Sequence, residues 1–395
     1  MTAIELPRRE GLEKSLAEAR WQFGGLRVDP WLAVENLSYL NDVFSGSDGP
    51  ETSDVTATAG AGLRAFLPVG PDTIIAGYAL PQYIYWQDLE ERRQLVGRYG
   101  AGVFTYFNRA TLEVMLSSHE EQRFASSEFT QLAVSQRDRL EVVGEVRLVR
   151  SLWLTAAGET SELRYQVDDL DEIPTPQFSL LNRDEEVTRI GLRAQLRGGW
   201  DVSLGLESFE TDFIDPGLNL SNSGDSPYLS IRFQEDEQGV LVSLLQRKLD
   251  PEPGSIFVPF DELVGNATWN QPLSARFTFS LFAARQLGYS LINGYSHTLE
   301  DRVGLALAWS WNRRLSFQVS AEQGESSYQR TLMSTAAERQ DDIQATGLRI
   351  SWQILPKLSL GVGYSRTEFD SNLPRFDREL DQITTSINLG GIDWP

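Results

Sequence analysis

The sequence predicts an all-β fold: a transmembrane antiparallel β-barrel of about 18 strands (roughly 16 to 20) preceded by a short N-terminal helix. Three observations predict it. Apolar and polar residues alternate with a period of two along most of the chain, short turns alternate with long polar loops, and no apolar run is long enough for a spanning helix. The clearest alternation sets Leu315, Phe317, Val319 and Ala321 against Ser316, Gln318, Ser320 and Glu322.

Composition narrows the class of protein. The chain has 395 residues and a mean hydropathy of -0.29. No stretch approaches the roughly 18 apolar residues of a spanning helix, which excludes a helical membrane protein. The 10 Trp, 12 Tyr and 19 Phe fit the aromatic girdles of a barrel, although a large soluble sandwich or propeller would also carry many aromatic residues.

Charge and cysteine content exclude several functions. The formal net charge of -21 argues against nucleic-acid binding, because few cations are left over to neutralise phosphates. The absence of cysteine removes disulfides, thiolate metal sites and a cysteine nucleophile. No Walker loop or dinucleotide motif is found, so we expect no cofactor.

The connections between strands form two sets. Short turns are expected at Pro68–Asp72, Asn108–Ala110, Arg150–Leu152, Gly198–Trp200, Gln238–Gly239, Asn270–Leu273, Asn312–Arg314 and Leu355–Lys357. Longer loops are expected at Asn41–Ser53, Gln87–Gln94, Glu120–Glu128, Asp168–Glu185, Ile214–Asp225, Asp250–Glu262, Gly288–Ser296, Gln329–Arg339 and Asp370–Asp377. The sets alternate and give about 17 connections, as expected for short periplasmic turns and long external loops.

The N-terminus is set apart from the strands. Residues Glu10 to Gln22 predict a short amphipathic helix ended by Gly24-Gly25, and we expect it outside the barrel wall on the turn side. Residues 1–25 would form a periplasmic segment and residues 26–395 the outer-membrane barrel. Residues Met1 to Glu10 lack a secretory signal, so this interpretation implies that a signal peptide has been removed.

The polar faces of the predicted strands carry many arginines. An arginine on the lipid face costs about 2–4 kcal/mol at mid-bilayer, so these faces should point into the lumen. The candidate lumen-lining residues are Arg64, Arg189, Arg193, Arg197, Asp201, Glu207, Arg232, Arg276, Glu322 and Arg349. Such residues could set pore selectivity, or they could be cross-strand ion pairs that hold the wall.

Nothing in the sequence marks a catalytic or metal site. The two histidines, His119 and His297, lie far apart at strand-to-loop borders. If a hydrolase site existed, Ser118-His119 or Ser296-His297 would be the places to look. The acidic clusters at 168–172 and 184–186 lack EF-hand spacing, so solvated loops, with calcium bridging to lipopolysaccharide as one possibility, explain them best. We therefore expect neither an enzyme nor a metal site.

As an ordered set, several motifs resemble the β-barrel porin 2 family, outer-membrane β-barrels associated with exopolysaccharide secretion. They are Leu26 to Trp31, Tyr39 to Phe44, Trp269, Arg285, Tyr328, Arg339, Asp341, Ser371, Phe376-Asp377 and the last strand Ile383 to Leu389. The resemblance covers about Gly25 to Leu389 and implies a passive conduit for polysaccharide. Two departures are the terminal Ile392-Asp393-Trp394-Pro395, without a closing aromatic in the strand, and Tyr39-Leu40-Asn41, without a polar residue before Asn41.

The leading hypothesis is a bacterial outer-membrane conduit that exports polysaccharide or passes hydrophilic solutes. Its expected partners are the lipid bilayer and lipopolysaccharide, together with polysaccharide and periplasmic export components. The alternatives are a general diffusion porin for small solutes and a closed scaffold barrel that holds a partner in the outer membrane. A soluble all-β protein is a further alternative, favoured by the missing signal.

Overall fold

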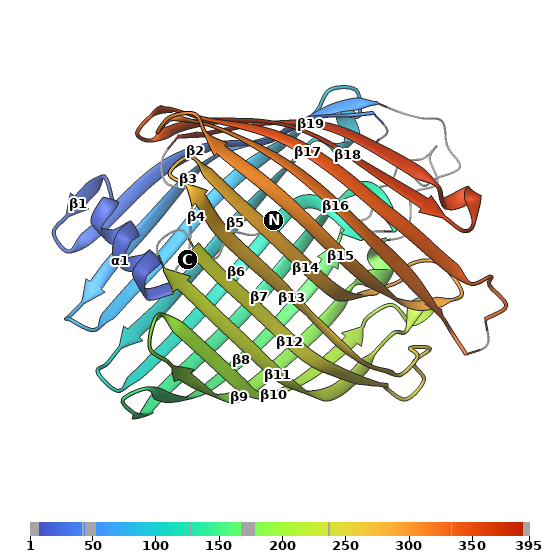
Figure 1. Ribbon diagram of the computed structural model, residues 1–395, viewed down its shortest axis with the longest axis horizontal. Helices are drawn as coiled ribbons and strands as arrows, with labels where there is room; N and C mark the ends of the chain where they lie inside the picture. Colours follow the sequence, from blue (N-terminus) through green and yellow to red (C-terminus); the bar gives the residue numbers. More distant parts are fainter. Residues whose placement is uncertain are drawn as a thin grey trace.

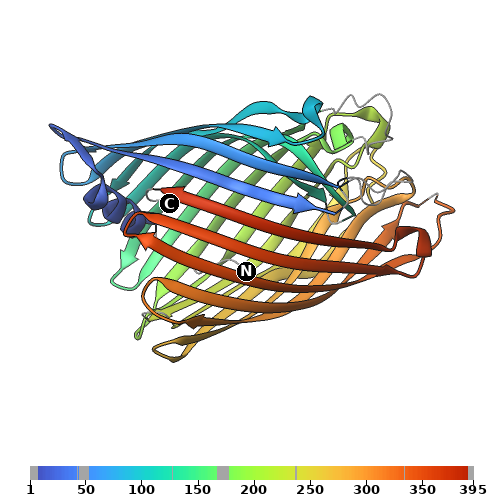
Figure 2. The ribbon, with the colours of Figure 1, turned by 90° about the horizontal axis from the view of Figure 1, so that it is seen from above.

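The structure is a computed structural model that describes residues 8–41, 43, 53–126, 128–166, 178–235, 238–332 and 334–389. The strands of these segments form one antiparallel barrel, shown in Figures 1 and 2. They follow one another round the wall in chain order, and β19 pairs with β2 to close it. The predicted barrel of 18 strands is therefore confirmed, with one extra short strand before it.

The bounds of the elements are as follows. The wall consists of β2 (Leu26–Leu40), β3 (Asp54–Val69), β4 (Thr73–Trp86), β5 (Gln94–Tyr106), β6 (Ala110–Ser126), β7 (Phe129–Val149), β8 (Leu152–Tyr165), β9 (Arg183–Gln195), β10 (Trp200–Phe213), β11 (Asn222–Glu235), β12 (Gln238–Pro251), β13 (Phe260–Ser274), β14 (Phe277–Tyr289), β15 (Tyr295–Ser310), β16 (Leu315–Arg330), β17 (Arg339–Leu355), β18 (Leu358–Ser371) and β19 (Arg378–Leu389). Helix α1 (Arg8–Glu18) and strand β1 (Trp21–Phe23) precede it, and the 3-10 turns η1 (Glu90–Arg92), η2 (Phe178–Leu181), η3 (Pro216–Leu218) and η4 (Pro374–Phe376) lie in connections.

The two faces of the wall differ in chemistry. One face carries large apolar side chains that stay exposed because no protein covers them, among them Phe277, Leu281, Leu305, Leu348 and Trp352. The cross-strand register places Phe279, Leu307 and Ile350 on this same face. The opposite face carries the ion pairs described below. The apolar face therefore meets lipid and the polar face lines the lumen.

Short turns lie at one end of the barrel and most of the long connections at the other, as predicted, but the predicted loop at Glu120–Glu128 is wrong because β6 continues to Ser126 and β7 begins at Phe129. Two turns are displaced from their predicted positions. Strand β12 already begins at Gln238, and β13 runs past Asn270–Leu273 to Ser274. The error at β13 has a physical cause: Asn270 and Pro272 suggest a turn, but in the structure they pair with Ser280 and Thr278 of β14. Most of the loops at 41–53 and 168–185 lies outside the described residues.

Helix α1 lies inside the wall, so its predicted position outside the barrel is wrong. Leu12 is fully buried against Phe66, Phe104 and Met115, which belong to the inner faces of β3, β5 and β6 near the turns. The guanidinium of Arg9 lies 5.0 Å from the ring centroid of Tyr106. Burial of this apolar side chain favours docking against the inner wall over exposure to water. Figure 2 shows the helix at the turn-side mouth of the barrel. No helix among the described residues is long and apolar enough to span a membrane.

The hairpin formed by β6 and β7 leaves the wall near the loop end. Pairing of β6 with β5 stops at Glu120, and pairing of β7 with β8 stops at Ser135. Between these points the two strands pair only with each other. We call residues 121–134 the inward hairpin. Ser127 is not among the residues that the structure describes.

The inward hairpin crosses the lumen. Its Leu132 and Val134 pack in one cluster with inward residues of β2, β4, β5 and β19, including Trp86. At its tip, Glu128 Oε1 accepts a hydrogen bond from Ser290 Oγ at 2.5 Å. Its Oε2 accepts one from the backbone N–H of Leu291 at 2.8 Å. Ser290 and Leu291 follow β14, nearly opposite β6 in the strand order, so the hairpin obstructs the loop-side half of the lumen.

Candidate functional site: the lumen cavity

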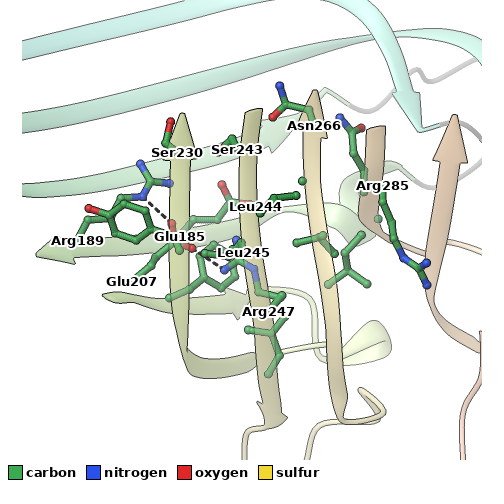
Figure 3. Close-up of a pocket in the computed structure, with 18 of the residues that line it drawn as sticks. Glu185, Arg189, Glu207, Ser230, Ser243, Leu244, Leu245, Arg247, Asn266 and Arg285 are labelled. Atoms are coloured by element: carbon green, nitrogen blue, oxygen red, sulfur yellow. Dashed lines mark hydrogen bonds and ion pairs between the residues drawn. The ribbon is translucent and has the colours of Figure 1, made fainter. Parts of the chain in front are cut away.

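A cavity of about 910 Å³ lies inside the barrel along β7 to β15. Residues from strands that are not neighbours line it together, for example Glu145 of β7, Arg247 of β12 and Glu300 of β15. Only the inner side of a closed wall brings such strands to one space. Figure 3 shows Arg189, Glu207 and Arg247 grouped on this wall.

Glu207 is the central carboxylate of the cavity wall. It accepts a hydrogen bond from Arg189 Nε at 2.6 Å and forms an ion pair with Arg247 Nη1 at 2.9 Å. The Glu207 side chain is 2% exposed, whereas that of Arg189 is 49% exposed. Register places Glu207 opposite Arg189, because both occupy inward positions on β10 and β9. One side of the Arg189 guanidinium is therefore held by Glu207 while the rest faces the cavity.

Two further arginine–carboxylate groups extend this wall. Arg193 bridges two carboxylates, with Nη2 2.8 Å from Glu145 Oε2 and Nη1 3.2 Å from Asp201 Oδ1. Glu185 pairs with Arg183 at 2.7 Å and with Arg137 at 3.4 Å. Charge-assisted bonds of this kind fix the planar guanidinium groups in defined orientations. The wall therefore presents ordered alternating charges.

The loop-side end of the cavity is apolar. Leu181, Leu249 and Phe257 belong to a buried cluster there, against which Leu287 and Tyr289 pack. The Tyr289 hydroxyl accepts a hydrogen bond from Asn222 Nδ2 at 3.0 Å, which satisfies a polar group in this setting. The cavity is thus charged along its wall and apolar at its outer end.

The structure places most of the predicted lumen residues on the inward strand face. These are Arg64, Arg189, Arg193, Asp201, Glu207, Arg232, Glu322 and Arg349. They do not form one cluster. Arg64 pairs with Asp29 at 2.7 Å beside the β2–β3 wall, and Glu322 pairs with Arg302 at 2.8 Å on the other side. Their role in selectivity stays a prediction.

Arg197 and Arg276 do not lie on the wall. They occupy the β9–β10 and β13–β14 turns, so their placement on strand faces is corrected. The alternation was extended past the strand ends, where no ladder fixes the direction of a side chain. They belong to a group of basic turn residues that also includes Arg109, Arg150, Arg313, Arg314 and Lys357. This turn-side rim is basic in the described part of the chain.

The sequence missed several residues of the cavity. Arg247 stands between Gln246 and Lys248, so alternation assigns no face to it. Glu185 lies in an acidic run that was assigned to a loop, whereas β9 begins at Arg183. The direction of Arg247 follows only from the register of β12 and β13, in which Arg247 pairs with Glu262 and Leu245 pairs with Val264. A longer continuation of the alternation of Ile190 and Leu192 would have brought Glu185 to the inward face.

Neither histidine occupies a recognisable reaction centre. His119 Nε2 contacts the Tyr78 hydroxyl on the inner wall. Ser296 Oγ lies 3.2 Å from His297 Nδ1, but the ring of His297 packs between Phe257 and Phe260 and both residues are buried. Within the described segments, no three His, Asp or Glu residues are grouped in a way that could hold a metal ion.

Known structures with a similar fold are outer-membrane barrels. Pseudomonas aeruginosa OccK2 (OpdF), solved in complex with glucuronate, is 10% identical, with 92% of this chain and 98% of that chain covered and a TM-score of 0.54. The outer membrane protein OpdK of Pseudomonas aeruginosa is 11% identical, with 92% and 98% covered and a TM-score of 0.54. Acinetobacter baumannii OccAB3 is 12% identical, with 92% and 99% covered and a TM-score of 0.53. No protein-family model and no curated protein sequence matches the chain.

At these identities the likeness establishes the fold alone, which is that of a closed outer-membrane β-barrel. The closed wall and its apolar outer face place the chain in the bacterial outer membrane, surrounded by lipid and lipopolysaccharide. The likeness supports a porin-type barrel in general. It gives no support to the exopolysaccharide-associated family in particular.

Proposed function

We propose that the barrel passes small hydrophilic solutes across the outer membrane, and that it is not a catalyst. The observation that carries this proposal is the inward hairpin, which spans the lumen from the β6–β7 wall to Ser290 on the far side. It leaves a cavity of about 910 Å³, within the roughly 300–1,000 Å³ typical of small-molecule sites. A small solute fits such a space.

Export of polysaccharide is disfavoured by the same obstruction. A polymer must occupy the whole length of a channel at once, whereas the inward hairpin packs against the inner wall on both sides. The cluster around Phe257 is mostly apolar and offers few hydrogen-bond partners to sugar hydroxyls. We therefore favour the small-solute alternative over the polysaccharide conduit and over the closed scaffold.

We further propose small carboxylates as preferred solutes. The half-exposed guanidinium of Arg189 faces the cavity, and guanidinium groups bind carboxylates in a bidentate manner. OccK2 was solved with glucuronate and OpdK with vanillate, and both molecules carry a carboxylate. We also propose that residues 1–25 and the turns face the periplasm, because long loops are external in barrels of this kind.

The test is solute entry into vesicles that contain the purified barrel. The proposal predicts rapid swelling with glucuronate, slower swelling with glucose, and none with a long dextran. The variant Arg189→Gln should remove the preference for glucuronate, whereas Arg164→Gln, in an outward-facing ion pair with Asp184, should keep it. Equal entry of dextran and glucuronate would restore the polysaccharide hypothesis, and no entry of any solute would favour the scaffold.

A further inference from the structure

The barrel wall has a seam between β13 and β14. Their pairing runs from the turn up to Gly265 and Arg285 and stops there. Beyond this point β13 continues to Phe260, paired only with β12, and β14 continues to Tyr289, paired only with β15. Both segments are fully described, so the wall lacks backbone pairing between β13 and β14 on the loop side of Gly265 and Arg285.

Gly265 explains locally why the ladder ends there. Its φ is 156°, and a Cβ on it would lie 2.1 Å from the backbone oxygen of Ser243 on β12. Only glycine permits so close an approach. Strand β13 is therefore drawn against β12, while Leu287 and Tyr289 of β14 pack inward on the apolar cluster. The two strands diverge from Gly265 onward.

A groove of about 480 Å³ lies on the outer side of this seam. The exposed apolar side chains Leu263 and Val303 border it, together with Ala283. The groove and the lumen cavity are lined in common by Leu244, Val264, Gly265, Asn266 and Arg285. These five residues therefore form the wall between the lumen and the lipid-facing surface at the seam.

Arg285 stands at the junction of the two spaces, on the strand next to that of Asn266 in Figure 3. Its Nη2 lies 2.5 Å from Glu262 Oε2 of β13 and its Nη1 3.7 Å from Asp301 Oδ2. Its Nε–H is buried and has no acceptor within the described part of the chain. On the outward face it follows Leu281 and Ala283, so it lies at the loop-side edge of the apolar band.

We propose that the seam is a lateral portal through which a single-chain amphiphile with a carboxylate head moves between the loop-side leaflet and the lumen cavity. The apolar groove binds the alkyl chain of the amphiphile. Arg285 binds its carboxylate head through the Nε–H that has no acceptor among the described residues and through the guanidinium edge that pairs with Glu262 in this structure. The Arg285–Glu262 ion pair is the latch that joins the strands where the ladder is absent. The portal is separate from axial passage of hydrophilic solutes.

Stapling the groove tests the portal. The chain contains no cysteine, so Leu263→Cys and Val303→Cys can be joined by a bis-maleimide across β14. The matched control joins Val319→Cys and Leu348→Cys, half-exposed apolar partners on the intact β16–β17 ladder. The probe is dodecanoic acid with a diazirine at its tail, added to phosphatidylcholine vesicles that contain the barrel. Peptide mapping then locates the photolabel.

The portal predicts labelling of Leu245 and Leu249 on the inner face of β12. The groove staple should lower this labelling roughly tenfold, because the cross-link closes the route from the groove to the lumen. The control staple should leave the labelling unchanged. Arg285→Gln should lower it about tenfold through loss of a charge-assisted bond, and Arg285→Lys should retain part of it.

Lumen labelling that survives the groove staple would overturn the portal, because the probe would then enter through the barrel ends. Labelling confined to lipid-facing residues in every variant would also overturn it, because the groove would then be ordinary lipid contact. The assay does not depend on conduction. Failure of solute passage is detected separately by vesicle swelling.

Discussion

Glu207 shows how the lumen places charge in a confined space. Two arginines share one buried carboxylate, so the group keeps an excess positive charge that faces the cavity through Arg189. Removing the carboxylate would leave the two guanidinium groups close together with no counter-charge between them. The arrangement therefore serves both the stability of the wall and the attraction of anions.

We predict that Glu207→Gln destabilises the barrel by about 3 kcal/mol, the low end for a broken buried ion pair, because Arg189 is half-exposed. Urea unfolding in lipid vesicles measures this. The matched variant Glu379→Gln breaks the exposed pair with Arg366 and should cost much less stability than Glu207→Gln, because water and salt screen exposed ion pairs. Equal losses in the two variants would show that Glu207 is not a structural centre.

Arg232 and Arg349 differ from the other predicted lumen arginines. Within the described segments neither forms an ion pair, although Asp201 is the cross-strand partner of Arg232. We predict that Arg232→Gln combined with Arg349→Gln shifts the reversal potential in a salt gradient toward cations with little change in stability. Arg164→Gln, on the outer face, is the control. An unchanged reversal potential would mean that selectivity is set elsewhere.

For single residues, the sequence predicted well which face of the wall a side chain lies on, and predicted its ion-pair partners poorly. Alternation places Arg193 and Asp201 on one face because strand geometry fixes the direction of every second side chain. It cannot show that Arg193 bridges Glu145 and Asp201, since that pairing depends on the register of three strands. Beyond strand ends, as at Arg276, even the direction is lost.

Among the elements, the inward hairpin matters most for function. Its sequence carries one signal of its unusual position: Leu132, Ala133 and Val134 are consecutive apolar residues, as expected where both faces of a strand are covered. Sequence analysis placed a loop at Glu120–Glu128, whereas β6 continues to Ser126. The separation of β6 from β5 and of β7 from β8 depends on tertiary contacts, which the local sequence pattern does not show.

Glu128, between β6 and β7, makes the hairpin sensitive to pH. Burial raises the pKa of its carboxyl from 4.5 to about 6, against the opposing effect of hydrogen bonds from Ser290 and Leu291 and of the Arg339 and Arg378 charges. Because the docked state favours the protonated acid, this contribution is full below pH 4.5 and is lost as pH rises through 6. The shift corresponds to about 2 kcal/mol.

We therefore predict that the backbone amides of the inward hairpin exchange faster at pH 7.5 than at pH 5, after correction for intrinsic rates. Hydrogen exchange with mass spectrometry measures this. Glu128→Gln should remove the difference because glutamine does not titrate. A difference that persists in Glu128→Gln would assign the pH dependence to another group.

For the whole molecule, the barrel, its strand number and its lipid face follow from the repeated alternation of apolar and polar residues along the chain. In a closed barrel each strand pairs with two neighbours, so many alternating strands with polar loops leave few other folds. Helix α1 was misplaced because the burial of Leu12 depends on Phe66 and Phe104, which are distant in sequence. The seam at Gly265 was likewise invisible, since both strands continue beyond it and only their mutual pairing ends.

The proposed orientation gives a prediction for intact cells. Protease added outside should cleave within the long connection between β8 and β9 and spare helix α1, which lies in the turn-side mouth. Western blotting against tags at each end would detect the fragments. Cleavage confined to the N-terminal segment would reverse the orientation.

The central claim is that the inward hairpin limits the channel to small solutes. Glu121 and Ser135 are cross-strand partners, so residues 122–134 can be replaced by a two-residue Asn-Gly turn without disturbing the wall. Single-channel recording with polyethylene glycols of increasing size measures conductance and the size limit together. We predict a larger conductance and entry of polymers that the unmodified barrel excludes. An unchanged conductance and an unchanged size limit would contradict the claim.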